Sequence, residues 1–127
     1  MNRDRFDELL RQCGVQVRFT KAAAEDFQSL QKNQRRFVLA LILKQAQKNP
    51  RLRPAGNGIP LHRELAGLAK IKSKSANLRV VYRPVDEEDG TVTMEIIAIG
   101  PRDHDKVYKE AARRMMARDS EQKESSL

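Results

Sequence analysis

The segment from Leu68 to Ile99 reads LAKIKSKSANLRVVYRPVDEEDGTVTMEIIAI, and its pattern decides the fold. Three runs rich in valine, isoleucine and leucine alternate here with two short polar stretches. Branched apolar residues favour strands, whereas serine, asparagine, aspartate and glycine favour turns. We therefore predict three strands, joined as an antiparallel meander, at about residues 68–74, 78–85 and 92–99.

The third of these strands carries apolar side chains on both faces. The two-residue period of a strand places Val92, Met94, Ile96 and Ala98 on one face, and Ile97 and Ile99 on the other. A strand that is apolar on both faces is usually buried on both. We expect it to lie centrally in the sheet.

Upstream of the meander, the sequence predicts one strand and mostly helix. A short polar or frayed helix is expected at residues 4–12, and a strand at 15–19, where apolar and polar residues alternate. Thr20 can cap a helix over residues 22–30, because its hydroxyl accepts a hydrogen bond from an otherwise free N–H group.

The clearest helix covers residues 34–47, where good helix formers dominate after a break at Lys32 and Asn33. Asn49 and Pro50 end this helix, and the loop that follows runs to Pro60. Loops of this length are often functional. One helical turn is expected next, at residues 61–65.

The C-terminal part predicts a helix at residues 105–116 and a disordered charged tail. We divide the chain into an N-terminal extension (1–14), one folded domain (15–118) and the tail (119–127). Helices grouped before a meander indicate the α+β class. The expected architecture is a small, twisted, mainly antiparallel sheet with two N-terminal helices on one face and a C-terminal helix.

Composition sets limits on the class of protein. The 127 residues suffice for one modest core, and 39% hydrophobic residues with 5% aromatic residues predict a mainly aliphatic one. Cys13 is the only cysteine, which excludes an internal disulfide and a Cys-rich metal site. With no apolar run typical of a signal peptide or a membrane span, we expect a cytoplasmic protein without membrane contact.

Charge is distributed unevenly along the chain. The net charge is +8, and between Phe27 and Val85 thirteen lysines and arginines stand against one acid, Glu64. Such a surface repels itself unless a polyanion or an acidic protein neutralises it. The middle of the chain therefore indicates a site that handles RNA.

The strand period concentrates part of this charge on one face. Lys70, Lys72 and Lys74 share a side of the first meander strand, and Arg79 and Arg83 can share a side of the next. Because the expected helices pack on one face of the sheet, we predict that these cations line the other, open face.

Four motifs follow one another in an order that is similar to a known family. They are KIK at 70–72, LRVVY at 78–82, IGPRDHDKVY at 99–108 and AARR at 111–114. Together they resemble the RelE side of the RelE/ParE superfamily of bacterial toxins, over about residues 15–115. The resemblance implies a RelE-like fold and a type II toxin–antitoxin toxin. It also implies an endoribonuclease (mRNA interferase) that needs no cofactor or metal and cuts mRNA in the ribosomal A site.

The resemblance also implies the acting residues. The RNA-cutting members use two lysines around a strand, an arginine on the next strand, an arginine after the last strand and a tyrosine further on. These positions match Lys70, Lys72, Arg79, Arg102 and Tyr108. Members of the ParE side, which poison DNA gyrase, share the fold but generally lack the full set.

The chemistry explains these residue types. Cleavage of RNA by its own 2′-hydroxyl needs a base, positive charge on the reacting phosphate and a group that holds the nucleotide in line. Lysine, with a usual pKa of about 10.4, acts as a base only when neighbouring cations or burial lower that pKa. Arginine clamps phosphate, and Tyr108 can stack on a base. Which lysine is the base, and which group is the acid, stays open.

Further cations are expected to contact ribosomal RNA: Arg35, Arg36, Lys44, Arg51, Arg53, Lys74, Arg83 and His104. His104 can also act as an acid near neutral pH, although a lone histidine after a strand usually faces solvent. Tyr82 is expected in the core or at a sheet edge.

Two readings of the basic surface remain. Besides the enzyme, a non-catalytic binder fits it: a ParE-like gyrase inhibitor or a plain RNA-binding module, in which the charges act only through counterion release. The resemblance also implies a cognate antitoxin, an acidic or amphipathic segment that covers the basic face and displaces the terminal helix.

Overall fold

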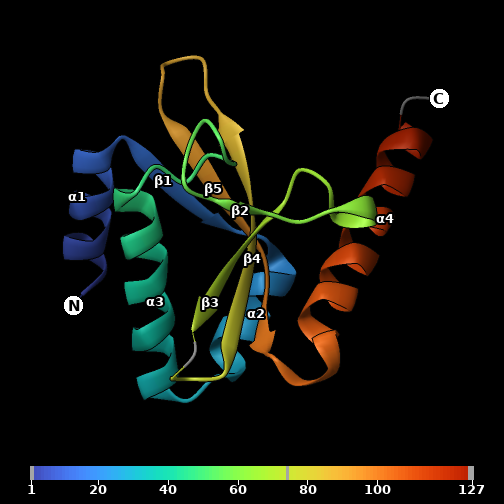
Figure 1. The fold of residues 1–127 in the computed structure, drawn as a ribbon, viewed down its shortest axis with the longest axis horizontal. Helices are drawn as coiled ribbons and strands as arrows, with labels where there is room; N and C mark the ends of the chain where they lie inside the picture. The colour runs from blue at the N-terminus through green and yellow to red at the C-terminus, as the bar shows by residue number, and fades with distance from the viewer. Residues whose placement is uncertain (1, 74, 126–127) are drawn as a thin grey trace.

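The computed structural model describes residues 2–73 and 75–125, without the side chains of residue 104 and residues 120–125. Figure 1 shows the elements, which follow in this order: α1 (Arg3–Cys13), β1 (Val15–Phe19), α2 (Lys21–Ser29), α3 (Lys32–Gln47), β2 (Ile59–Pro60), the short 3-10 helix η1 (Arg63–Leu65), β3 (Ala69–Ser73), β4 (Leu78–Asp86), β5 (Val92–Pro101), the 3-10 helix η2 (Asp103–Asp105) and α4 (Lys106–Ser125).

The strands form one sheet in the order β1-β5-β4-β3-β2. β1 runs parallel to β5, and the remaining neighbours are antiparallel. The predicted meander and the α+β class are therefore confirmed. β5 lies between β1 and β4 and is buried from Val92 to Gly100, as its apolar residues on both faces predicted.

One face of the sheet packs against the N-terminal helices (Figure 1). α3 contributes Val38 and Ile42 to this core, and α1 contributes Phe6 and Leu10. α1 is therefore part of the main core and not only a frayed polar helix; Gly14 ends it in the left-handed region, at φ +70°. A glycine adopts that conformation without a steric cost.

The predicted cap of α2 is confirmed, because the Thr20 hydroxyl accepts a hydrogen bond from the Ala23 N–H at 3.1 Å. The break before α3 falls one residue earlier than predicted. Gln31 is the cap. Its N–H donates to the Gln34 side chain at 3.0 Å, and its own side chain accepts from the Gln34 N–H. Lys32 and Asn33 therefore form the first turn of α3.

α4 covers part of the opposite face, which the sequence predicted to be open. Val107 and Ala111 of α4 pack on Val81, Ile97 and Ala98. The open-face prediction was therefore wrong, because α4 has apolar residues of its own to bury there. The predicted faces of Ala98 and Ile99 were wrong for another reason, a β-bulge that breaks the strand period: Val81 pairs with Ala98, but Tyr82 pairs with Ile96. The extra residue, Ile97, turns with Ala98 towards α4, whereas Ile99 returns to the main core.

α4 also continues beyond its predicted end. The segment after residue 118 was expected to be disordered, but the helix runs to Ser125. Glu121, Gln122 and Lys123 are good helix formers that extend an existing helix without a new nucleus. The last two residues, 126 and 127, lie outside the described part of the chain.

The loop before β2 is folded tightly against β4. Tyr82 is fully buried, and its hydroxyl donates to the Pro50 carbonyl at 2.8 Å. Gly58 lies so close to this hydroxyl that a Cβ atom at residue 58 would be only 2.8 Å from the phenol oxygen. Of the two places expected for Tyr82, the core and a sheet edge, the structure shows the core.

Candidate functional site

The register of β3 and β4 brings three of the predicted catalytic cations onto the face that carries α4. Lys72 pairs with Arg79, and Lys70 pairs with Val81, which packs under α4. Ile71 and Ala69 alternate with the lysines and point into the main core. The alternation predicted for Lys70, Lys72 and Arg79 is therefore present in the structure.

Lys72 and Arg79 border a hollow of about 340 Å³ at the end of the sheet, which we name the cation cavity. It is lined by Lys72, Ser73, Asn77, Arg79 and Arg102. Arg102 follows β5, and its backbone N–H donates to the Asn77 carbonyl at 3.1 Å. This hydrogen bond joins the β3–β4 turn to the segment that carries Arg102.

Arg79 is the most enclosed of these cations, with 6% of the residue exposed. Its guanidinium donates to the carbonyls of Leu78 and Ser73, at 3.0 and 3.3 Å. Among the described residues, no carboxylate lies within 4.0 Å of the charged groups of Lys70, Lys72, Arg79 or Arg102. The cavity therefore holds positive charge without a paired anion.

Two titratable groups respond to this environment. Burial lowers the pKa of the Lys70 ammonium, and the positive charges of Lys72 and Arg79 lower it further, whereas Asp105 acts in the opposite direction. Burial raises the pKa of the Tyr108 phenol, and the charges of Arg79 and Arg102 oppose that rise. Lys70 and Tyr108 thus both lie within electrostatic reach of Arg79.

A second cationic group on the same face has a different arrangement. Glu95 of β5 is 5% exposed and accepts hydrogen bonds from Arg18, Arg83 and Arg118 at 3.0, 3.1 and 2.7 Å. We name these four residues the Glu95 cluster. Burial alone would raise the pKa of Glu95, but hydrogen bonds and charge from Arg118, Arg18 and Arg83 lower it to about 2.

The residues predicted to contact ribosomal RNA differ in how free their charges are. Arg36, Lys44 and Arg53 are exposed. Arg51 forms an ion pair with Asp86 at 2.6 Å, Arg83 belongs to the Glu95 cluster, and Arg35 donates to the Leu30 carbonyl at 2.9 Å. Lys74 and the side chain of His104 lie outside the described part of the chain.

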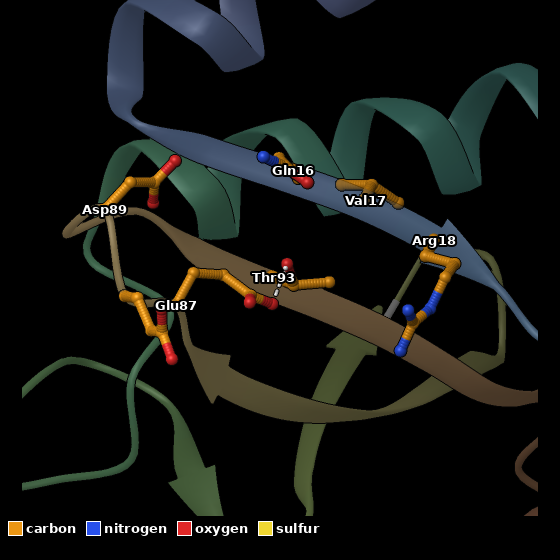
Figure 2. Close-up of a pocket in the computed structure, with 7 residues that line it drawn as sticks. Gln16, Val17, Arg18, Glu87, Asp89 and Thr93 are labelled. Atoms are coloured by element: carbon orange, nitrogen blue, oxygen red, sulfur yellow. Dashed lines mark hydrogen bonds between the residues drawn. The ribbon is translucent and has the colours of Figure 1, made fainter.

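A larger hollow, of about 550 Å³, lies at the β4–β5 turn. Figure 2 shows its lining, which comes from the β4–β5 turn (Glu87 and Asp89), from β1 (Gln16 and Arg18) and from Thr93 of β5; the Thr93 hydroxyl donates to Glu87 at 2.8 Å. The three carboxylates of the turn, Glu87, Glu88 and Asp89, would repel a nucleic acid backbone. The cation cavity, although smaller, is the better candidate for binding RNA.

Sequence reasoning did not identify every residue of the site. Asn77 and Ser73 line the cation cavity, and Asn77 adopts a left-handed conformation at φ +52°. Its position in a predicted turn was a signal for that conformation but not for its place beside Arg102. Glu95 was also missed, although an acid within an apolar strand signals a buried partner.

Two kinds of feature are absent from residues 2–73 and 75–125. No helix there is long and apolar enough to cross a membrane. The same part of the chain contains no group of three or more histidine, cysteine, aspartate or glutamate side chains placed to hold a metal ion.

A protein-family model described as ParE toxin of type II toxin-antitoxin system, parDE, matches residues 17–106. The chain belongs to the ParE toxin family. This confirms the RelE/ParE superfamily predicted from the motifs and makes the protein a toxin of a type II toxin–antitoxin system. No curated protein matches this ParE-family toxin.

Solved structures with a similar fold are RelE toxins. A free E. coli RelE with two arginine-to-alanine substitutions is 22% identical, with a TM-score of 0.57 over 78% of this chain and 95% of that chain. The isolated E. coli RelE toxin is 23% identical, with a TM-score of 0.54 over 79% and 97% of the two chains. The RelE mutant in complex with an antitoxin RelBc peptide is 26% identical, with a TM-score of 0.51 over 77% and 94%. The ParE-family toxin therefore has a RelE-like fold.

Proposed function

We propose that this toxin is a ribosome-dependent endoribonuclease that cleaves mRNA in the A site. The observation that carries the proposal is the convergence of the five predicted catalytic residues. Lys72, Arg79 and Arg102 line one cavity, and Lys70 and Tyr108 lie within electrostatic reach of Arg79. Cations without a paired carboxylate provide a place for a phosphate.

In the proposed reaction, the 2′-hydroxyl of one nucleotide attacks the adjoining phosphate. Lys70 takes the hydroxyl proton, because its lowered pKa raises the fraction of neutral amine at neutral pH. The bond from the 2′ oxygen to phosphorus forms while the bond to the 5′ oxygen breaks. The departing 5′ oxygen takes a proton from water, which leaves a 2′,3′-cyclic phosphate and a 5′-hydroxyl. Arg79 and Arg102 stabilise the charge that develops on the phosphate oxygens.

Tyr108 holds the nucleotide for in-line attack. The residue is half-buried at the start of α4 and packs against the apolar cluster under this helix, to which Val81, Ile97 and Val107 belong. A fixed aromatic ring offers a stacking surface for a base at a small entropic cost. In this role Tyr108 orients the substrate and does not exchange a proton, which agrees with the raised pKa of its phenol.

Partners follow from the surface and from one relative. The exposed Arg36, Lys44 and Arg53 are the best placed of the predicted residues to contact ribosomal RNA, because Arg35, Arg51 and Arg83 are engaged within the protein. A cognate antitoxin is the second partner, which the likeness to the RelE–RelBc complex supports. We place the toxin in the cytoplasm, where ribosomes are.

A non-catalytic gyrase inhibitor is the second candidate. The family model carries the ParE description, and the Arg79 guanidinium already donates to two backbone carbonyls, which limits its freedom to bind a phosphate. In that case the same cations would only bind an acidic partner, and Lys70 and Tyr108 would have no catalytic role.

The experiment incubates the purified toxin with ribosomes programmed with a defined mRNA and maps new 3′ ends. Relaxed DNA with purified gyrase tests supercoiling in parallel. We expect cuts at A-site codons, unchanged supercoiling, and loss of the cuts in Lys72→Ala with ribosome affinity retained. Arg113→Ala, which removes an exposed cation of α4 away from the cavity, is the matched control. Intact mRNA together with inhibited gyrase would establish the second candidate instead.

A further inference from the structure

The end of β5 that leads to Arg102 is not supported by a strand on both sides. β1 pairs with β5 only as far as Ile96, opposite Phe19, and the Thr20 N–H then donates to the Ile96 carbonyl at 3.2 Å. β5 itself continues to Pro101. Its last five residues therefore extend beyond the described end of β1.

Two side chains satisfy the backbone where β1 is missing. The Ile99 N–H donates to the Oδ2 atom of Asp26, on α2, at 3.0 Å. The Ile97 carbonyl accepts from the Nη1 atom of Arg114, on α4, at 2.7 Å. Ile97 and Ile99 are 1% and 6% exposed, so water does not replace these bonds easily.

Asp26 and Arg114 also bind each other in a two-pronged ion pair. Nη1 donates to Oδ2 at 2.7 Å and Nη2 donates to Oδ1 at 3.0 Å. The Nε atom of Arg114 donates to Glu110 at 3.1 Å, so the guanidinium is fixed on three sides. The two paired side chains are only 17% and 21% exposed. Paired planar groups of this kind fix orientation as well as distance.

This arrangement joins the two elements that deliver residues to the cation cavity. Ile99 precedes Arg102 by three residues on β5. Arg114 follows Tyr108 by six residues on α4, about 9 Å along the helix axis. One ion pair therefore fixes the second half of β5 against α2 and the first half of α4 against β5.

We propose that Asp26 and Arg114 are positioning residues of the cavity: by replacing the missing strand beside Ile97–Ile99, they hold Arg102 and Tyr108 in register with Lys72 and Arg79. Neither side chain lines the cation cavity, so they act through the backbone that they hold. The catalytic consequence rests on the proposed nuclease function; the effect on the backbone does not.

Arg118→Ala is a matched control, because it also removes an ion pair between an α4 arginine and a carboxylate that is largely buried. Arg118, on the same helix one turn later, binds the buried Glu95, at 2.7 and 3.2 Å; within the described residues, its side-chain hydrogen bonds reach only Glu95. Arg118→Ala should destabilise the fold without moving Arg102 or Tyr108. Arg113→Ala, next to Arg114 but exposed, tests the loss of a cation alone.

The experiment compares Asp26→Ala, Asp26→Asn and Arg114→Lys with these controls. Single-turnover cleavage on programmed ribosomes should fall about tenfold or more in Asp26→Ala, because misplacement by about 1 Å costs this much or more. The ribosome concentration for half-maximal rate should stay unchanged. Asp26→Asn should recover part of the rate, since its amide oxygen can still accept from the Ile99 N–H. Arg118→Ala and Arg113→Ala should cleave within about twofold of the wild-type rate.

Amide hydrogen exchange provides a reading that does not depend on cleavage. Exchange across residues 99–108 should accelerate in Asp26→Ala and Arg114→Lys and stay at the wild-type rate in Arg118→Ala. The proposal is overturned if Asp26→Ala and Arg118→Ala change exchange in this segment equally, or if both cleave at the same rate per folded molecule. If the wild-type toxin leaves mRNA intact, the nuclease function fails, and exchange alone decides whether the pair positions this segment.

Discussion

The two ends of the sheet face under α4 carry similar numbers of cations in opposite electrostatic states. At one end, Arg18, Arg83 and Arg118 surround the buried Glu95. At the other end, the cations of the cation cavity have no carboxylate within 4.0 Å among the described residues. The first group supplies its own anion and stabilises the fold. The second leaves positive charge for an anion that the described residues do not provide within ion-pair distance.

This difference separates structural cations from functional ones more clearly than exposure does. Arg79 is as enclosed as Glu95, yet its guanidinium meets carbonyls and other cations instead of a carboxylate. Clustered like charges reduce stability, and the lowered pKa of Lys70 records part of that cost. An unneutralised cluster beside a hollow is therefore the stronger indication of a site that binds phosphate.

The largest expected effect comes from removing the anion of the Glu95 cluster. Glu95→Ala leaves three arginines facing one another across a small void, and we expect a loss of about 3–5 kcal/mol in the free energy of unfolding. Urea denaturation followed by circular dichroism measures it. Cleavage per folded molecule should stay near the wild-type rate, because the cluster lies away from the cation cavity.

Glu110→Ala is the matched control for this change. Glu110 also accepts from two arginines, Arg113 and Arg114, but its side chain is 38% exposed, so solvent screens the interaction. We expect a loss below about 1 kcal/mol. Equal losses in Glu95→Ala and Glu110→Ala would mean that burial of Glu95 adds nothing, and the comparison of the two ends would lose its basis.

At the other end, Arg102→Ala should have the opposite profile. Arg102 is exposed and has no ion pair within the described residues, so the free energy of unfolding should change little or rise. Cleavage on ribosomes should fall about 10²- to 10³-fold, as for the loss of one donor to a charged transition state. Arg102→Lys should recover only part, since lysine lacks the two-pronged geometry. Undiminished cleavage in Arg102→Ala would remove this residue from the catalytic set.

Much of the fold followed from local patterns in the sequence. The strand β1, the capped start of α2 and the β3–β4–β5 meander each depend on residues that are neighbours in the chain, so propensity and period were enough to predict them. The three cations that line the cation cavity, Lys72, Arg79 and Arg102, were also predicted, because the motifs resemble a family whose residues act together.

The partners of individual cations could not be predicted in this way. The bulge between Val81 and Tyr82 turns Ile97 and Ala98 towards α4, and no local signal in a run of apolar residues reveals such an insertion. The sequence grouped Arg83 with the RNA-binding residues. Its pairing with Glu95 depends on the β4–β5 register, which a local pattern does not reveal. Asp26 and Arg114 meet across 88 residues, beyond any periodic pattern.

The next effect is the pH dependence of the Glu95 cluster. A carboxyl whose pKa falls from 4.5 to about 2 on folding contributes about 3 kcal/mol of stability. Because the folded pKa is the lower one, this contribution is complete above the unfolded value and is lost as the pH falls from about 5 towards 2. Denaturation at a series of pH values should show a steeper loss in the wild type than in Glu95→Gln. Parallel curves for the two proteins would contradict the assignment.

A smaller effect is expected on the rising limb of the pH–rate profile, where Lys70 loses its proton. The negative charge of Asp105 raises the pKa of Lys70, so Asp105→Asn should lower that pKa further and move the rise in rate to lower pH. Asparagine also tolerates the left-handed conformation of residue 105, at φ +57°. The pH–rate profile of single-turnover cleavage measures the shift. Asp103→Asn, which changes a neighbouring carboxylate, should leave the limb in place; if Asp105→Asn does so too, Lys70 is not the base.

The smallest effect is expected where an ion pair lies at the surface. Arg51 binds Asp86 at 2.6 Å, but the two side chains are 33% and 73% exposed, against 6% for the Glu95 side chain. Water already stabilises both charges, and holding two long side chains together costs entropy, so Arg51→Ala should lower the free energy of unfolding by about 0–1 kcal/mol. Urea denaturation at low and high salt tests this, since screening should remove most of the difference. A loss as large as that of Glu95→Ala would show that distance, and not burial, sets the strength of the arginine–carboxylate pairs in this fold.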